Sequence, residues 1–305
     1  MSAKSQSRAM LLGLSAVLLW STVATAFKLS LQVMSPLQLL GWSGLFSTLV
    51  LAAAVSWQRQ WGELLQQVKQ RPGFYCALGV LNPALYYLVL FRAYDLLPAQ
   101  QAQALNYTWA LTLALLAVPL LKQKLYRVDV IAMLLGYLGA LVIATRGDLL
   151  ALEFDSPTGV ALALGSTLIW ALYWILNTRA EGSPAVTLLL CFLFGTPLVW
   201  ALMAWQGALQ LPPLQGMLGA AYVGLFEMGV TLLLWLGALR AATHVSRISN
   251  LIFLSPFLSL VFIRLFLNEP IVPATFVGLG LIVGAVVLQQ RAKRSEPAPA
   301  TEQPE

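Results

Sequence analysis

The sequence contains few charged residues. Asp, Glu, Lys and Arg make up 10% of its 305 residues, against roughly a quarter of an ordinary soluble domain. The two cysteines, Cys76 and Cys191, lie inside apolar runs and lack the spacing of a zinc site or a redox motif. We expect the two cysteines to be small core residues. This composition excludes a soluble globular domain, and we expect neither a cofactor nor a metal site.

Sequence patterns typical of catalysis are also missing. There is no HExxH motif, no glycine-rich phosphate loop and no pair of acids within one apolar run, and His244 is the single histidine. We therefore expect that the chain is not an enzyme, and a membrane-embedded enzyme is the weaker alternative for its function.

What the sequence has instead is long apolar runs. Hydrophobic residues make up 59% of the chain, and they gather in runs of about 20 residues, the length of a helix that crosses a bilayer. Runs this long and apolar are helices rather than barrel strands. The predicted spans are 10–30, 36–57, 73–94, 98–121, 127–146, 157–178, 184–205, 214–239, 243–267 and 271–290. The sequence thus predicts an all-α membrane protein with ten transmembrane helices.

The positive charges are distributed unequally between the two sides. If the N-terminus is cytoplasmic, 14 of the 18 Lys and Arg residues fall in cytoplasmic segments, and Lys28, Arg92, Arg146 and Arg264 face the outside. This positive-inside bias accounts for the net charge of +6 without a nucleic-acid partner. It predicts a multi-pass protein of a bacterial-type inner (plasma) membrane with both termini in the cytoplasm.

The two halves of the chain resemble each other. The segments around Trp20 and Trp170 are similar, and each is followed by a Ser-Pro pair, at Ser35 and at Ser183. Each half holds five spans, an odd number, so the second half must enter the membrane upside down. A repeat of this kind is typical of transporters. The predicted domains are a first five-helix repeat (1–146), an external linker (147–156), a second five-helix repeat (157–290) and a disordered cytoplasmic tail (291–305).

The segment between the second and third spans has an amphipathic pattern. Trp61, Leu64, Leu65 and Val68 recur at helical spacing, with basic residues nearby. Two interpretations stay open for residues 58–71: a short helix lying on the inner leaflet, or a plain cytoplasmic loop.

The end of the chain carries a family resemblance. Its residues are Leu-Ser-Pro at 254–256, Asn-Glu-Pro at 268–270, and glycines at 278, 280 and 284. This pattern resembles the last two helices of an EamA-type transporter, of the drug/metabolite transporter superfamily, and the Trp20 and Trp170 segments are similar too. The resemblance implies ten helices, an inverted repeat, and export or exchange of small metabolites such as amino acids and amines. Lys124 departs from the family, which often has an acid there.

One acid, Glu227, is expected near the middle of a span. A shift of 145 positions aligns it with Asn82, so the two would be related by the repeat and lie near the midplane, where such transporters bind substrate. Tyr86 shares a helical face with Asn82. Desolvation penalises the charged form of a carboxyl group, which would let Glu227 exchange a proton for a substrate's amino group. The alternative is a structural acid that does not titrate.

Aromatic and amide side chains extend this candidate substrate-binding site. Trp170, Tyr173 and Trp174 lie on one face of the sixth span, with Trp20 as the counterpart of Trp170, and such faces bind organic cations. Asn106 and Asn250 belong to polar stripes on the fourth and ninth spans. The alternatives are packing or interfacial roles for the aromatic residues, and interhelical hydrogen bonds for the amides.

Together these features predict a secondary transporter. Its partners would be the lipid bilayer and a small amine-bearing substrate such as an amino acid or an organic amine, moved by alternating access with or without coupling to protons. The alternative on the same fold is a transporter of sugar phosphates or nucleotide-linked substrates, which would need Lys or Arg near the midplane. A homodimer stays open, because glycines such as Gly280 and Gly284 permit close packing within one chain or between two.

Overall fold

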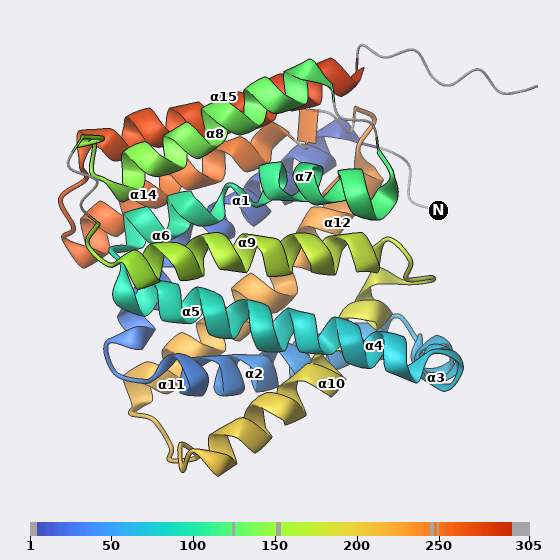
Figure 1. Ribbon diagram of the computed structural model, residues 1–305. Coiled ribbons are helices and arrows are strands. Elements are labelled where there is room, and N and C mark those ends of the chain that lie inside the picture. Colours follow the sequence, from blue (N-terminus) through green and yellow to red (C-terminus); the bar gives the residue numbers. More distant parts are fainter. Residues whose placement is uncertain (1–4, 124–125, 151–153, 245–246, 249, 295–305) are drawn as a thin grey trace, which may run out of the picture.

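The structure is a computed structural model that describes residues 5–123, 126–150, 154–244, 247–248 and 250–294. Lys124, part of the predicted linker and residues 295–305 of the predicted tail lie outside the described residues. Within the described part all regular structure is helical, and the helices run roughly side by side as a bundle (Figure 1).

The helices follow the predicted spans closely. In chain order they are α1 (Gln6–Leu31), α2 (Pro36–Trp57), α3 (Trp61–Gln70), α4 (Pro72–Gly79), η1 (Val80–Leu85), α5 (Tyr86–Leu96), α6 (Ala99–Asn106), α7 (Trp109–Leu121), α8 (Arg127–Ala144), α9 (Pro157–Asn177), α10 (Pro184–Trp205), α11 (Leu214–Tyr222), η2 (Val223–Val230), α12 (Thr231–Ala241), η3 (Asn250–Leu254), α14 (Ser255–Leu267) and α15 (Pro273–Arg294). Several of these join end to end, and the described residues contain nine spans long and apolar enough to cross a membrane, plus the shorter apolar helix Pro273–Gln289. The all-α fold of ten transmembrane helices is confirmed.

Helix ends are set by local side chains. Ser35 caps α2 in a capping box, in which its hydroxyl accepts from the Gln38 N–H at 3.2 Å and its own N–H donates to the Gln38 side chain at 3.1 Å. At the other end of a span, α7 and α14 stop at left-handed residues, Lys122 and Asn268, both with φ 54°. Equivalent helices of the two halves therefore end in the same way.

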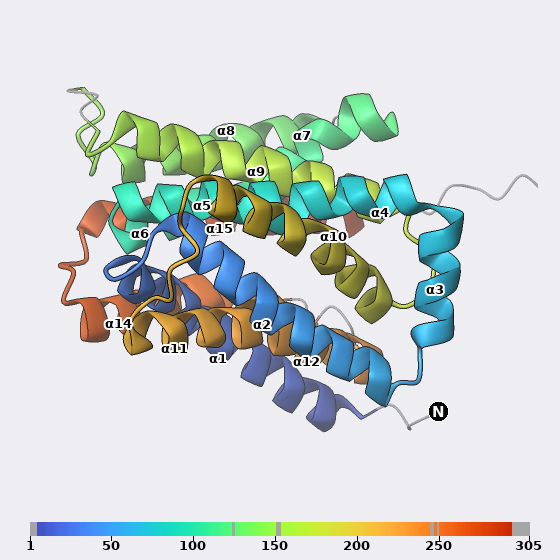
Figure 2. The ribbon, with the colours of Figure 1, turned by 90° about the horizontal axis from the view of Figure 1, so that it is seen from below.

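Each half of the chain packs against the other. α1 of the first half packs on α12 and α14 of the second half, and its counterpart α9 packs on α5 and α7 of the first half. Figures 1 and 2 both show α9 beside α5. The interface between the halves therefore runs through the whole bundle, and the two repeats are inverted relative to each other.

Two glycines show the repeat at atomic detail. A Cβ on Gly79 would lie 2.5 Å from the Cys191 backbone oxygen on α10, and a Cβ on Gly224 would lie 2.3 Å from the Ser43 backbone oxygen on α2. Gly79 and Gly224 are 145 positions apart, and Ser43 and Cys191 are 148 positions apart. Equivalent residues thus make equivalent helix crossings, and both crossings lie a few residues from the candidate acid and its counterpart.

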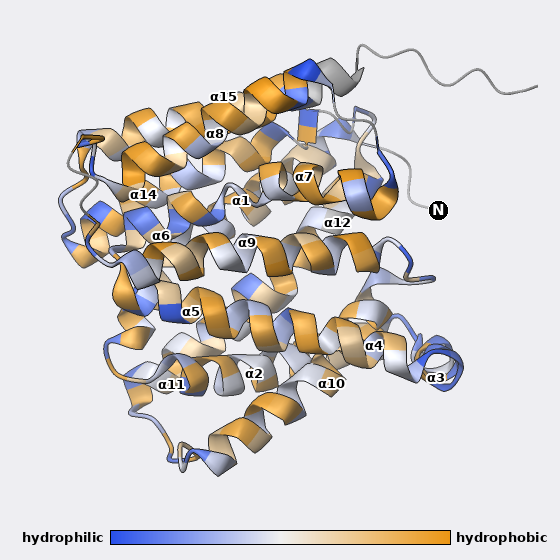
Figure 3. Ribbon diagram, viewed as in Figure 1, coloured by the Kyte–Doolittle hydropathy of each residue, from blue (hydrophilic) through white to orange (hydrophobic). Residues whose placement is uncertain are grey.

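The edges of the bundle are polar and its middle is apolar, as Figure 3 shows. We call the edge where α1 begins the terminal edge. There the Ser5 N–H donates to the Ala241 carbonyl at 3.0 Å, and the Gln6 side chain accepts from the Thr243 and His244 N–H groups. The opposite edge carries the connections 32–35, 97–98, 206–213 and 268–272 and the described residues 145–150 and 154–156. α1 begins and α15 ends at the terminal edge (Figure 1).

The segment between α2 and α4 is a helix, α3, and not a plain loop. Leu64 is buried against the bundle, while Trp61 and Leu65 are exposed. The Gln67 side chain ties α3 to the connection between α9 and α10, because it donates to the Glu181 carbonyl at 2.7 Å. Exposed aromatic and apolar side chains beside a bundle edge suit a membrane surface, so the inner-leaflet location stays a prediction.

Candidate functional site

The candidate acid lies in a π-helical turn, and its counterpart lies at a kink between two helices. Glu227 is in η2, near the middle of the span Leu214–Ala241, and Asn82 is in η1, near the middle of the span Pro72–Leu96. Inside η1 the backbone of Asn82 is non-helical (φ −143°, ψ 117°), and Pro83 follows without an N–H to donate. π-Helical turns and broken helices at midspan are frequent at functional sites of helical and membrane proteins.

Glu227 has one neutral partner. Its Oε1 accepts from the Tyr87 hydroxyl, with an O–O distance of 3.2 Å. Among the described residues no other hydrogen bond and no ion pair to Lys, Arg or His is made by this side chain. Glu227 is also partly accessible, although it sits in the middle of a span. A carboxylate can accept several hydrogen bonds, so this one has room for a ligand's donors.

Aromatic rings continue from Tyr87 into the bundle. Tyr87 contacts Tyr86 with ring centroids 4.8 Å apart, and Tyr86 stacks on Trp170 at 4.4 Å with an interplanar angle of 26°. Trp170 in turn stacks on Tyr173 at 5.4 Å and meets Trp174 edge-on at 5.8 Å. The rings of α5 and α9 therefore form one continuous group that begins beside Glu227.

An amide joins this group from a third helix. Asn106, the last residue of α6, accepts from the Tyr86 hydroxyl at 3.4 Å and donates to the Ser166 hydroxyl of α9 at 3.0 Å. We call Glu227, Tyr87, Tyr86, Asn106, Trp170, Tyr173 and Trp174 the central cluster. It draws on both halves of the chain.

The chemistry of the central cluster favours a cationic group. A carboxylate without a cationic partner attracts an ammonium group, and the faces of Tyr and Trp rings attract cations. In the described residues no group of three or more His, Cys, Asp or Glu side chains could hold a metal ion.

Comparison with known proteins shows the family and the fold of the chain. The family model described as "EamA-like transporter family" matches residues 7–145 and 157–289, which is most of the chain. The chain belongs to the EamA-like transporter family. The "Uncharacterized transporter YvbV" of Bacillus subtilis (strain 168) is 25% identical over 244 residues, covering 77% of each chain. One crystal structure superposes with a TM-score of 0.66 and 23% identity over 96% of this chain and 100% of its own, which shows a shared fold.

Two predicted site residues of this EamA-like transporter, Trp20 and Asn250, lie apart from the contacts of the central cluster, whereas Asn82 interacts with Tyr173 of the cluster. Asn82 is 3% exposed, and its side-chain oxygen is buried without a partner. Trp20 packs on Trp235 of α12 with ring centroids 5.5 Å apart. Asn250 is exposed at the start of η3. Substrate binding by each of them stays a prediction.

Helical spacing did not indicate Tyr87 of the central cluster or Ser166, which accepts a hydrogen bond from Asn106. An α-helical period places Tyr86, four residues after Asn82, on the face of Asn82, but the backbone is kinked at Asn82, so this period does not continue from Asn82 into α5. The sequence signal for this kink is Pro83, a proline in the middle of a span.

One cavity borders the central cluster, and another is separate from it. A cavity of about 270 Å³ lies between α7, α9 and α15 and is lined by Trp174, Thr178 and Gln289. Trp174 therefore contacts the other rings of the central cluster and also lines this cavity, which lies near the terminal edge. A cavity of about 420 Å³ lies at the opposite edge and includes Lys28, Arg146 and Glu269.

Substitution of Trp170 tests whether the rings bind a cation. Trp170→Leu removes the ring stacked between Tyr86 and Tyr173, so we expect the KM for an amine substrate in proteoliposomes to rise about 3- to 30-fold, the range of one cation–π contact. Trp205→Leu is the control, because Trp205 is 82% exposed at the end of α10, and it should leave KM unchanged. Equal KM values for the two variants would contradict a binding role.

Proposed function

We propose that this EamA-like transporter moves small amine-bearing metabolites, such as amino acids or organic amines, by alternating access. In this proposal Glu227 binds the substrate's ammonium group and exchanges it for a proton. The observation that carries the proposal is the position of Glu227 at midspan, where a tyrosine hydroxyl is its partner and no Lys, Arg or His of the described residues pairs with it.

An acid in the middle of a membrane is costly unless its charge is compensated. A substrate ammonium and a proton can each compensate it, and they compete for the same carboxyl group. Binding of one therefore releases the other, which couples the two movements. The cluster draws Tyr86, Tyr87 and Asn106 from the first half and Trp170 and Glu227 from the second, so relative motion of the halves would open it to one side at a time.

The phosphorylated-substrate alternative is less well supported. Phosphate groups are bound by Arg and Lys side chains, and in the described part of the chain no such side chain contacts the central cluster. A substrate with a positive rather than a negative group fits the central cluster.

The test is uptake by proteoliposomes of the full-length protein. A panel of amino acids, organic amines, carboxylic acids and sugar phosphates is offered with and without a pH gradient. We expect uptake of amine-bearing compounds, driven further by the gradient in the wild type and no longer by the gradient in Glu227→Gln. Uptake of sugar phosphates alone would overturn the substrate class, and equal gradient dependence in both proteins would overturn the role of Glu227.

We also propose a bacterial-type inner membrane as the location, with both termini cytoplasmic, on the basis of the positive-inside bias. Single cysteines replacing Gln66 on α3 and Gln210 at the opposite edge test the orientation, in a background without Cys76 and Cys191. A membrane-impermeant maleimide should label Gln210→Cys in intact cells, and it should label Gln66→Cys only after the cells are lysed. The reverse pattern would overturn the orientation.

A further inference from the structure

The cavity at the opposite edge is separate from the central cluster. Its volume is about 420 Å³, and it lies where α1, α5 and α8 end and where α6 and α15 begin. Its lining combines charged side chains, Lys28, Arg146 and Glu269, with apolar ones such as Leu96 and Ile143. Nothing in the proposed transport chemistry of Glu227 uses these residues.

The positive charge in this cavity is anchored to a helix end. The Nζ of Lys28 donates to the Tyr94 and Leu97 carbonyls, at 2.6 and 2.7 Å, at the C-terminal end of α5. An ammonium group has three N–H donors, so one remains after these two bonds. The carbonyls hold the group in place without neutralising it.

The negative charge in this cavity, on Glu269, is held at the N-terminal end of a helix. The Oε1 of Glu269 accepts from the N–H of Ala99, the first residue of α6, at 3.1 Å. Its Oε2 is buried and has no partner. Lys28 and Glu269 do not form an ion pair with each other, since the ion pairs of the described residues join other side chains.

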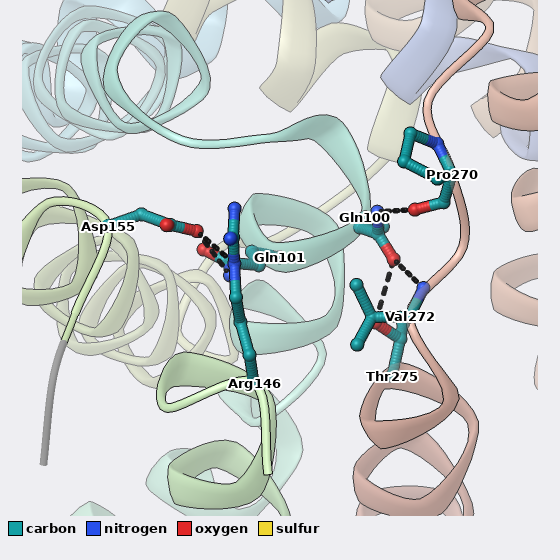
Figure 4. A network of polar contacts seen from close by, with 7 residues as sticks. All are labelled: Gln100, Gln101, Arg146, Asp155, Pro270, Val272 and Thr275. Atoms are coloured by element: carbon teal, nitrogen blue, oxygen red, sulfur yellow. Dashed lines mark hydrogen bonds and ion pairs between the residues drawn. The ribbon is translucent and has the colours of Figure 1, made fainter. Parts of the chain in front are cut away.

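A second acceptor without a partner lines the same cavity. Gln101 is 3% exposed, and its Nε2 donates to Asp155 at 2.8 Å, whereas its Oε1 is buried and unpartnered. Asp155 also accepts from the Nε of Arg146 at 2.8 Å, and Arg146 is half-exposed at the cavity. Figure 4 shows Gln101 and Arg146 converging on Asp155.

The wall of the cavity is held by one side chain. Gln100 donates to the Pro270 carbonyl at 2.9 Å and accepts from the Val272 N–H at 3.1 Å and the Thr275 hydroxyl at 2.8 Å (Figure 4). These three bonds fix the connection before α15, which carries Glu269, against α6. The charged groups are thus positioned before any ligand arrives, which lowers the cost of binding one.

We propose that this cavity is a second binding site, for a small zwitterion with an aliphatic side chain. The free hydrogen of Lys28, with Arg146 at the mouth, would bind the carboxylate. Glu269 Oε2 and Gln101 Oε1 would accept from the ammonium group, and Leu96 and Ile143 would contact the side chain. A site of this chemistry would narrow the substrate class to amino acids. The proposal rests on the proposed function in one respect, that the ligand bound here is later transported.

Equilibrium dialysis of the purified full-length protein with radiolabelled L-leucine tests the site. In the Glu227→Gln background, which removes the charge of the central cluster, leucine should still bind. Adding Glu269→Gln or Lys28→Met should weaken that binding at least about tenfold, as expected for loss of a charged hydrogen bond. Isoamylamine and 4-methylpentanoate, which each lack one charged group of leucine, should compete at least about tenfold less well than leucine. Gel filtration checks that each variant is folded.

The control is Arg92→Gln, which removes a cation of the same edge that pairs with Asp95 and does not line the cavity. It should leave leucine binding unchanged. Two results would overturn the proposal: no leucine binding by the Glu227→Gln protein, or binding that Glu269→Gln and Lys28→Met leave within twofold. The role proposed for Glu227 in the central cluster is tested separately. It would be overturned if the pH gradient still drives uptake by the Glu227→Gln protein.

Discussion

Replacing Glu227 by glutamine is expected to lower the affinity for an amine substrate by about 30-fold to several thousandfold. Loss of one partner of a desolvated charge pair costs about 2–5 kcal/mol, and each 1.4 kcal/mol is a factor of ten. Glutamine keeps the size of the side chain and its acceptor toward Tyr87, so the bundle should stay folded. The measurement is KM for uptake in proteoliposomes, with folding checked by gel filtration.

Two further variants separate charge from packing. Tyr87→Phe keeps the carboxylate and removes its hydrogen bond, so we expect a loss of about tenfold, smaller than for Glu227→Gln. Glu63→Gln removes an acid on α3, outside the membrane spans, and should leave KM unchanged. A larger effect of Tyr87→Phe than of Glu227→Gln would mean that the tyrosine and not the acid contacts the substrate.

Adding one methyl group at Gly79 or Gly224 is expected to destabilise the bundle. The new Cβ would lie 2.5 Å or 2.3 Å from a backbone oxygen of the facing helix, and a backbone atom cannot rotate away as a side chain can. Overpacking of this kind costs about 1–3 kcal/mol. We therefore expect a lower thermal unfolding midpoint in detergent for Gly79→Ala and for Gly224→Ala, and similar losses for the two because the repeat relates their sites.

Matched controls exist in the same bundle. A Cβ on Gly165 in α9 or on Gly284 in α15 meets no atom within 4 Å. Alanine there gains helix propensity worth up to about 1 kcal/mol, so the unfolding midpoint should stay the same or rise. If all four variants unfold at the same temperature, the close crossings at Gly79 and Gly224 do not limit stability.

The boundaries of the helices were predictable because apolar length is a local property. The predicted spans 36–57 and 184–205 coincide with α2 and α10, since each begins at a proline after a serine and ends at a tryptophan. The equivalent midspan positions of Asn82 and Glu227 in the two repeats were also predictable. An acid inside an apolar run is rare, and the repeat indicates which residue is its counterpart.

The tertiary structure decided which side chains meet. The sequence placed Trp20 and Trp170 as equivalents, yet Trp170 stacks on Tyr86 whereas Trp20 packs on Trp235, because the facing helices carry different residues at these depths. Tyr87, which lies in α5 beyond the kink at Asn82, donates to Glu227, and helical periodicity does not continue through such a kink. Apolar length and charge are properties of one segment and can be read along the chain. Contacts such as that of Lys28 with the end of α5 depend on how separate helices pack against each other, and that is decided by the tertiary structure.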